Sequence, residues 1–525
     1  IVGIIMHSWL GSVVMFVCAS MLMWVERMMV RALFDTYKTD DAIPVAIYGT
    51  KAGGISLANS ISSVKIKKYL LQAFISDDKR MKHAYLMGKR VYINDEGIAH
   101  RMKDLKVKVL LVSPLKSELF RNNTKLVDEF VQAGIKIMMM PAAQEWDGKS
   151  NMTYQHLHEV EIEDLLPRDK IEVDMDAIGT MLKDKRVLIT GAAGSIGSEM
   201  VRQVAVYKPA ELILIDQAET PMHDVRLMMQ RQFADVKNET IVASITDKDH
   251  MEKVFSEHLP EYVFHAAAYK HVPMMEDNPM QAVRNNIGGT RIIADLAVKY
   301  GAKKFVMIST DKAVNPTNVM GCSKRICEIY CQSLNKAIVE GKVDGVTQFV
   351  TTRFGNVLGS NGSVIPLFKE QIKKGGPLTV THPDIIRFFM LIPEACKLVL
   401  EAGTMGKGGE IFVFDMGKPV KIVDLAKRMI SLSGAKNINI KFTGLREGEK
   451  LYEEVLNNAE NIKPTHHSKI MIAKVREYDY EEAKRNEDEL MELSYSHDDM
   501  KIVKKMKEIV PEYKSKVSKY EILDK

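Results

Sequence analysis

A glycine-rich turn after residue 190 constrains the fold of this chain more than any other stretch. A short apolar strand at 186–189 runs into Gly191-x-x-Gly194-x-x-Gly197 and then into an apolar-periodic helix. Glycines let the backbone approach a pyrophosphate closely, and the helix start offers unpaired N–H groups to hold it. This order predicts a βαβ unit that binds a dinucleotide through Gly191, Gly194, Ser195, Ile196 and Gly197.

An acidic residue follows this turn at the distance that a dinucleotide site requires. A second apolar strand, 212–215, ends in Asp216, about 20 to 25 residues further on, where a carboxylate can bond ribose hydroxyls. A carboxylate would repel a 2'-phosphate, so Asp216 favours NAD over NADP. The strand 262–265 leads into Ala266 and Ala267, whose small side chains would let the cofactor lie across the strand end. The alternative is a glycine turn in a βαβ unit that binds no dinucleotide.

Composition excludes several classes of protein. The 525 residues allow two or three globular domains, and the net charge of +5 is small for this length. No basic tract is interleaved with aromatic residues, so we expect no nucleic-acid partner. The five cysteines lack paired CxxC spacing, which indicates a reducing compartment and no zinc site. His466 and His467 have no carboxylate or cysteine at ligand spacing, so we expect polar loop residues and no metal.

The first 25 residues predict a transmembrane helix. Residues 1–25 contain no charged side chain, and Arg27, Arg31 and Lys38 follow, which places the remainder on the cytoplasmic side. Trp9 and Trp24 lie where an interfacial belt would have them. A buried helix of a soluble protein is the alternative. Because the first residue is isoleucine, the sequence is compatible with a longer protein that has further spans before this one.

Two α/β domains are expected after this helix, each Rossmann-like with a doubly wound parallel sheet. In the first, 44–141, apolar strands alternate with helical segments, but Lys51 stands where a middle glycine would let phosphate approach. An accessory domain that binds nothing, or binds an unidentified ligand, is as expected here as a working site. An acidic linker, 142–185, leads to the catalytic domain, 186–475. The tail, 476–525, is charged and helical by pattern, and we expect it to pack or to oligomerise.

Reactive side chains follow the later strands of the catalytic domain. The strand 305–308 delivers residues 309–312 to the carboxyl edge of the sheet, where open α/β sheets bind ligands. Met320 and Lys324 follow, four residues apart and so on one face of a helix. The strand 348–352 leads into a glycine-rich loop, 353–362, of the kind that usually carries binding.

Several long motifs, in order, resemble one family. They are GAAGSIGSE at 191–199, HAAAYKHVPMMEDNP at 265–279, NNIGGT at 285–290, STDKAVNPTNVMGCSKR at 309–325, RFGNVLGSNGSVIP at 353–366, HPDIIRFFM at 382–390 and GLREGEKLYEEV at 444–455. With them the chain resembles the membrane-anchored nucleotide-sugar 4,6-dehydratases of the extended short-chain dehydrogenase/reductase superfamily. The resemblance covers essentially the whole chain. It is highly specific for the family and less so for the sugar.

The resemblance implies NAD-dependent 4,6-dehydration of UDP-N-acetylglucosamine to a UDP-linked 4-keto-6-deoxy sugar. After Thr310, it puts the elimination pair on Asp311 as acid and Lys312 as base. As free side chains both have the wrong protonation state at neutral pH, so burial would have to raise the first pKa and lower the second, or let them share a proton. The alternative is a plain ion pair at a strand end.

One motif departs from the superfamily. Its usual Tyr-x-x-x-Lys is Met320-x-x-x-Lys324 here. Lys324 can still hold the nicotinamide ribose, but a thioether cannot take a proton, so the base for the carbon 4 hydroxyl is Asp311, Thr310 or a bound water. Met320 resembles the branch that retains configuration at carbon 5. An inactive site is the alternative.

Charge predicts the substrate contacts. Within the matched motifs, arginines and an amide could hold a nucleotide diphosphate, Glu449 could meet ribose hydroxyls, and Lys270 could lie near the sugar. The expected set is Lys270, Arg353, Asn356, Arg387, Arg446 and Glu449. Two rivals remain: a nucleotide-sugar 4-epimerase, and a membrane-bound protein that binds NAD and nucleotide sugar without turnover. We expect a homo-oligomer at the inner membrane with its catalytic domain in the cytoplasm.

Overall fold

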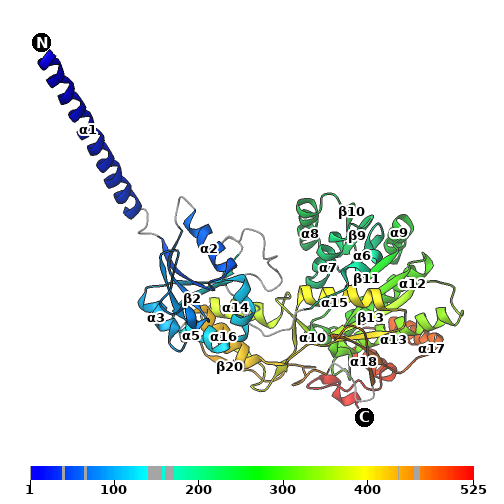
Figure 1. Cartoon of the computed structure of the whole chain (residues 1–525). Coiled ribbons are helices and arrows are strands. Elements are labelled where there is room, and N and C mark those ends of the chain that lie inside the picture. The colour runs from blue at the N-terminus through cyan, green and yellow to red at the C-terminus, as the bar shows by residue number, and fades with distance from the viewer. Residues whose placement is uncertain are drawn as a thin grey trace. The chain divides into compact units, whose positions relative to one another are not determined.

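The chain forms two compact units, residues 1–167 and 168–525, which are described separately (Figure 1). The computed structural model describes residues 2–37, 42–63, 68–139, 157–159, 171–435, 437–454 and 461–524. Most of the expected linker, 142–185, therefore lies outside the described residues. Its last part is not a linker: α6 (Met175–Leu182) is a helix that buries Ile178 and Leu182 in the core of the second unit.

Unit 1 begins with the long helix α1, Val2–Tyr37, which continues past the expected end of the span at residue 25. The segment Val13–Val30 is long and apolar enough to cross a membrane, and none of it is buried against the described residues. A core helix of a soluble protein would be mostly buried, although a signal sequence passes the same test of length and composition. The side chains of Trp9, Arg31 and Lys38 lie outside the described part of the chain.

The remainder of unit 1 is a mostly parallel sheet with helices. The strand order is β3-β4-β2-β1-β5-β6-β7, and only the outermost pairs, β3/β4 and β6/β7, are antiparallel. The strands are β1 (Ile43–Tyr48), β2 (Tyr69–Ser76), β3 (Tyr85–Leu86), β4 (Lys89–Ile93), β5 (Val109–Val112), β6 (Lys136–Met139) and β7 (His158–Glu159). The helices are α2 (Ala52–Ser62), α3 (Ile98–Asp104), α4 (Ser117–Asn122) and α5 (Thr124–Gln132).

Unit 2 contains the larger sheet, with strand order β10-β9-β8-β11-β12-β13-β18-β22-β21. Its first six strands are parallel and follow the order 3-2-1-4-5-6 of a doubly wound dinucleotide fold. They are β8 (Arg186–Thr190), β9 (Glu211–Asp216), β10 (Asn238–Val242), β11 (Tyr262–His265), β12 (Lys304–Thr310) and β13 (Gln348–Phe354). β18 (Ile411–Phe414) continues the parallel run, and β22 (Ile470–Lys474) and β21 (Asn461–Pro464) are antiparallel to it. The predicted fold class is confirmed.

Helices cover both faces of this sheet because its strands are apolar on both sides. One buried cluster contains α12 (Gly289–Lys299) and α13 (Val319–Val339); the other contains α7 (Ser195–Val206), α8 (Glu219–Gln232) and α15 (Ile392–Met405). Short strand pairs outside the main sheet carry part of the site. They are β14 (Asn356–Leu358) with β17 (Phe389–Leu391), β15 (Leu378–Val380) with β20 (Ile440–Phe442), and β16 (Ile386–Arg387) with β19 (Val420–Lys421).

The charged C-terminal tail packs into the core of unit 2. Its helices are α17 (Tyr480–Leu493) and α18 (Asp499–Ile509), which lie beside α13 (Figure 1). Leu490, Ile502 and Met506 are fully buried in the same cluster as α13. The tail is therefore an integral layer of the fold.

Candidate active site

A single large cavity of about 950 Å³ lies in unit 2 at the carboxyl ends of β8, β11 and β12, where doubly wound sheets bind ligands. It runs from the glycine turn, past the end of β12, to the loop at 446–453. It brings together most of the predicted site residues: Gly191, Gly194, Ser195, Ile196, Gly197, Ala266, Lys270, Thr310, Lys312, Met320, Lys324, Asn356, Arg387, Arg446 and Glu449. Four predicted residues do not line it: Asp216, Ala267, Asp311 and Arg353.

The glycine turn is built so closely that side chains are excluded. Gly191 has a φ of +67°, and a Cβ atom there would lie 2.7 Å from the backbone nitrogen of Ala267. A Cβ atom on Gly197 would lie 1.9 Å from the carbonyl oxygen of Gly191. The turn therefore packs directly on the first turn of α7, and Gly191, Gly194 and Gly197 line the cavity without side chains. This cradle fits the pyrophosphate of a dinucleotide.

Asp216 lies against the same turn. Its carboxylate accepts hydrogen bonds from the backbone N–H groups of Ala193, at 3.0 Å, and Ala218, at 2.9 Å. These bonds fix the carboxylate at the end of β9, beside the turn and outside the cavity wall. The position agrees with the spacing argument for a ribose contact, while the contact itself stays a prediction.

Gly197→Ala is expected to weaken NAD binding. The added methyl group would collide with backbone, and such overpacking costs about 1–3 kcal/mol. If that cost falls on the conformation of the turn that binds NAD, the affinity for NAD should drop about 5- to 150-fold, as measured by isothermal titration calorimetry. Gly179→Ala in α6 is the matched control, because its Cβ atom would meet only the Tyr207 ring at an ordinary 3.6 Å. Equal NAD affinity in both variants would contradict the cradle.

The turn that carries Asp311 and Lys312 follows β12 directly. Thr310 ends the strand, and residues Asp311–Ala313 form a single 3-10 turn, η6. The Thr310 hydroxyl donates to Asp311 Oδ1 at 2.8 Å, and Lys312 Nζ donates to the same oxygen at 3.0 Å. Asn356 Oδ1 accepts a second bond from Lys312 Nζ, also at 3.0 Å. Lys312 is therefore held from both sides, and Asn356, predicted as a substrate ligand, orients it.

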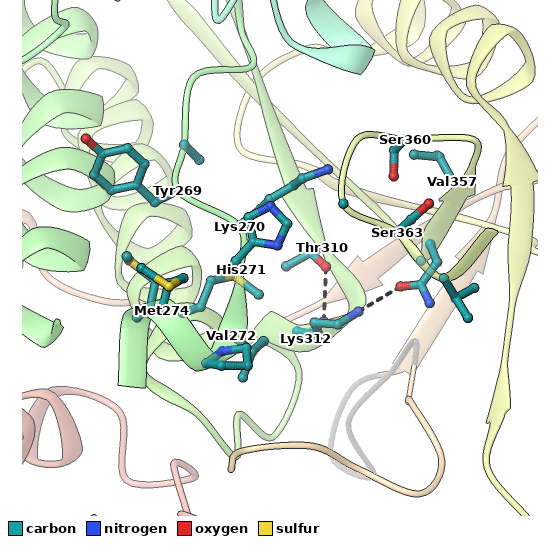
Figure 2. A pocket seen from close by; sticks show the side chains of 18 of the residues that line it. Tyr269, Lys270, His271, Val272, Met274, Thr310, Lys312, Val357, Ser360 and Ser363 are labelled. Atoms are coloured by element: carbon teal, nitrogen blue, oxygen red, sulfur yellow. Dashed lines mark hydrogen bonds between the residues drawn. The ribbon is translucent and has the colours of Figure 1, made fainter. Parts of the chain in front are cut away.

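Figure 2 shows how these side chains face the cavity. Thr310 and Lys312 lie in the middle, with Tyr269, Lys270 and His271 on one side and Val357, Ser360 and Ser363 on the other. Lys270 forms part of the wall, and burial lowers the pKa of its amine. Lys270, in the loop after β11, and Lys312, in the turn after β12, thus both face the cavity.

Helix α13 approaches the turn of Asp311 and Lys312 very closely. A Cβ atom on Gly321 would lie 2.1 Å from the carbonyl oxygen of Lys312, so only glycine allows this contact. The helix start is capped by Asn318, whose Oδ1 accepts from Gly321 N at 2.7 Å. Met320 and Lys324 consequently both line the cavity, and burial lowers the pKa of the Lys324 amine. Met320 is 4% exposed and offers no proton acceptor.

The pKa of Lys312 is not lowered in the free protein. Burial disfavours the charged form of its amine, but the carboxylates of Asp311 and Glu453 outweigh burial and hold the pKa of the amine above its ordinary value. Burial against the sugar and nicotinamide, or a shared proton, would have to make the amine a base. A group that takes the proton from Lys312 is therefore required before Lys312 can act as a base.

Two residues were missed by the sequence argument. Glu453 lines the cavity, with Oε1 3.8 Å from Lys312 Nζ. Asn286 is fully buried and clamps the backbone of Tyr269: its Oδ1 accepts from Tyr269 N at 2.7 Å, and its Nδ2 donates to Tyr269 O at 3.0 Å. Both lie inside motifs quoted above, GLREGEKLYEEV and NNIGGT, so the signal was present although no role was assigned.

The far end of the cavity carries the predicted substrate ligands. Arg387 Nη2 is 3.3 Å from Glu449 Oε1 and 2.8 Å from the carbonyl oxygen of Lys450. Glu449 Oε2 accepts from the backbone N–H of Arg446 at 3.1 Å. These bonds fold the 446–453 loop against β16. Arg387 and Arg446 both line this part of the cavity, and guanidinium groups suit a diphosphate.

Arg353 is not part of this wall, contrary to the sequence-based expectation. Its side chain is fully buried beneath the sheet edge, where it donates to Glu328 Oε1 at 2.8 Å and Oε2 at 2.6 Å. Burial favours the neutral carboxyl, but the guanidinium groups of Arg353 and Arg325 outweigh it and hold the pKa of Glu328 at about 2. Arg353 therefore pairs with Glu328 at the end of β13 and does not line the cavity.

Comparisons with known proteins agree with this architecture. The family described as polysaccharide biosynthesis protein matches residues 187–475. The capsular polysaccharide biosynthesis protein CapD of Staphylococcus aureus is 42% identical over 456 residues, which cover 85% of this chain and 74% of that protein. A UDP-glucose 4-epimerase of Rickettsia canadensis is 36% identical over 289 residues, 54% of this chain and 81% of that protein. The X-ray structure of Pen from Bacillus thuringiensis is similar with a TM-score of 0.52 and 32% identity, covering 59% of this chain and 98% of that one.

Proposed function

This chain belongs to the polysaccharide biosynthesis protein family, and from that premise we propose that it is an NAD-dependent UDP-N-acetylglucosamine 4,6-dehydratase. The product would be a UDP-linked 4-keto-6-deoxy sugar with retained configuration at carbon 5, used in glycan biosynthesis. The coarser part of this proposal, an enzyme that modifies a nucleotide sugar, is supported by the named relatives. The finer part rests on the residues of the cavity.

One observation carries the proposal: Thr310 and Lys312 lie between the glycine cradle and the two arginines in a single cavity. A dinucleotide at the cradle and a diphosphate at Arg387 and Arg446 would meet at this point. The reacting sugar carbons would therefore lie beside a hydroxyl and an amine that share one carboxylate. An elimination needs such a pairing of proton donor and acceptor.

The chain's own residues divide the work of dehydration. Bound NAD would supply the hydride chemistry, an oxidation at carbon 4 that is reversed by reduction at carbon 6. The Thr310 hydroxyl gives the proton of the carbon 4 hydroxyl a path to Asp311, because it already donates to that carboxylate. This path provides the proton acceptor for the carbon 4 hydroxyl that the thioether of Met320 cannot provide. Oxidation at carbon 4 acidifies the hydrogen on carbon 5, which the amine of Lys312 removes, while Lys324 holds the nicotinamide ribose.

We extend the proposal to location and assembly. Helix α1 would anchor the protein in the inner membrane with unit 2 in the cytoplasm, since Val13–Val30 has the necessary length and composition. We also propose a homo-oligomer. Cross-linking of membrane fractions and alkaline extraction test both statements.

A nucleotide-sugar 4-epimerase is the second candidate, favoured by the name of the Rickettsia canadensis relative. An epimerase needs the same oxidation at carbon 4 but no base for carbon 5. Lys312, held between Asp311 and Asn356 on the cavity side of the turn, is the feature that favours elimination.

The decisive measurement is anaerobic incubation of the purified protein with UDP-N-acetylglucosamine in heavy water. We expect loss of water from the sugar, a 4-keto signal by proton NMR, deuterium at carbon 5 and no net NADH. A sugar isomer with an intact carbon 6 hydroxyl would instead show an epimerase. Bound NAD without any change in several UDP-sugars would favour a binding protein without turnover.

A further inference from the structure

A second carboxyl group, Glu453, faces the cavity beside the catalytic lysine. Its side chain is 4% exposed, and its Oε1 lies 3.8 Å from Lys312 Nζ and 3.8 Å from Arg387 Nη2. Its Oε2 is buried and, among the described residues, has no hydrogen-bond partner. A buried carboxyl oxygen without a partner costs free energy unless it is protonated or meets a ligand.

Asp311 occupies a different position. Its carboxyl is 2% exposed and does not line the cavity. Its Oδ1 already accepts from both Thr310 and Lys312. Asp311 therefore sits behind the lysine, whereas Glu453 sits on the wall that the sugar would touch. The resemblance assigns the acid to Asp311, but the geometry places Glu453 where a departing hydroxyl could be reached.

The surroundings of Glu453 raise the pKa of its carboxyl, which allows it to hold a proton. Burial and the Asp311 carboxylate raise the pKa of Glu453 above its ordinary value, against the opposing charges of Lys312, Arg387 and Lys450. Arg387 is shared with Glu449, and Lys450 donates to the carbonyl oxygen of Val314 and is 3.6 Å from Glu454. Of the two cations within 4 Å of Glu453, only Lys312 can readily give up a proton.

We propose that Glu453 accepts the proton that Lys312 must lose before it can act as a base, and then delivers this proton to the carbon 6 hydroxyl. The inference rests on the proposed dehydratase function. It makes Glu453 the acid of the elimination and leaves Asp311 to hold Lys312 and to serve the carbon 4 hydroxyl through Thr310.

The proton balance of this step closes. A proton moves from the Lys312 ammonium to the Glu453 carboxylate, which leaves a neutral amine and a neutral carboxyl. The amine takes the carbon 5 proton, the electrons of that C–H bond form the C5=C6 double bond, and the C6–O bond breaks. The departing oxygen takes the proton of Glu453 and leaves as water. Lys312 is again an ammonium and Glu453 a carboxylate.

The pH dependence of Glu453→Gln tests the proposal. In the wild type, the Lys312–Glu453 pair is active when it holds one proton in total. At low pH both Lys312 and Glu453 are protonated, so kcat should fall on the acid side of its pH profile. In Glu453→Gln the lysine must lose its proton to solvent. We therefore expect the acid limb of the profile to move to higher pH and kcat at neutral pH to fall about 10²-fold or more, the range for a lost acid or base. Glu453→Asp should restore part of kcat.

Glu454→Gln is the matched control, because Glu454 is the next residue, is half-exposed and does not line the cavity. Its profile should match that of the wild type. A second readout, which does not need turnover, is the infrared band of the protonated Glu453 carboxyl as a function of pH. The band is assigned to Glu453 by its loss in Glu453→Gln. This band should persist to higher pH in Lys312→Met, which lacks the neighbouring ammonium.

The outcomes separate the two proposals. An active wild type with an unaltered Glu453→Gln profile would overturn the inference and leave the dehydratase standing. An infrared titration of Glu453 that is identical in wild type and Lys312→Met would also overturn it. A wild type that leaves UDP-N-acetylglucosamine unchanged, despite bound NAD, would instead remove the dehydratase and this proton delivery with it.

Discussion

Lys312→Ala is expected to lower the rate of ketosugar formation by about 10²- to 10⁴-fold, the range that a positioned acid or base contributes. The amine is the group on the cavity wall that can take the carbon 5 proton, and Asp311 and Asn356 fix it at 3.0 Å on each side. Alanine removes this amine from the end of β12. Mass spectrometry of the UDP-sugar product measures the loss.

A specific signature separates this effect from general damage. Oxidation at carbon 4 does not use Lys312, so the variant should accumulate NADH on mixing with substrate, with no deuterium at carbon 5. Lys374→Ala is the control, since Lys374 is 71% exposed, pairs only with Glu370 among the described residues and lies outside the cavity. Undiminished ketosugar formation by Lys312→Ala would remove Lys312 from the role of base.

Arg353→Met is expected to destabilise unit 2 by about 3–5 kcal/mol, the usual cost of breaking one side of a buried ion pair. The side chains of Arg353 and Glu328 are both 0% exposed. The variant therefore leaves the buried Glu328 carboxylate without the positive charge of Arg353. The effect should lie near the lower end, because Arg325 and Ser309 still donate to Glu328. Urea unfolding followed by circular dichroism measures it.

A double variant and the pH dependence sharpen this prediction. Glu328→Leu in the Arg353→Met background removes both charges and should recover part of the lost stability. The pKa of Glu328 is lowered on folding from 4.5 to about 2, so the pair stabilises the fold above about pH 4.5, and this contribution is lost as pH falls toward 2. Unchanged stability with a raised KM for the UDP-sugar would instead return Arg353 to the substrate site.

The fold followed from local patterns to a large extent. The strands around the glycine turn and at 262–265 and 348–352 were predictable because parallel strands are continuous apolar runs bounded by turns, and the last of these strands extends to Phe354 in β13. The strand β2, Tyr69–Ser76, was missed, because Gln72 interrupts its apolar run. Helix α6 was taken for linker because it is short and follows acidic residues.

Part of the candidate site could likewise be predicted from local sequence, and part could not. The glycine turn and the Thr310–Lys312 turn were identified because consecutive residues carry their function, and the cavity brings Gly191, Thr310 and Lys312 together. Arg353 was misjudged because a charge near the end of a strand gives no indication of what lies behind the sheet. Its partner Glu328 is 25 residues earlier, on a different element.

The doubly wound sheet, the glycine turn and the turn at the end of β12 could be predicted from the sequence, because they depend on backbone geometry and on neighbours within a few residues. The tertiary structure was needed to show which charges meet. It turned Arg353 away from the cavity, set Glu453 beside Lys312, and placed two carboxyls around that amine so that its pKa rises. Protonation states depend on burial and on charges a few ångströms away, and such distances between remote residues exist only once the chain has folded.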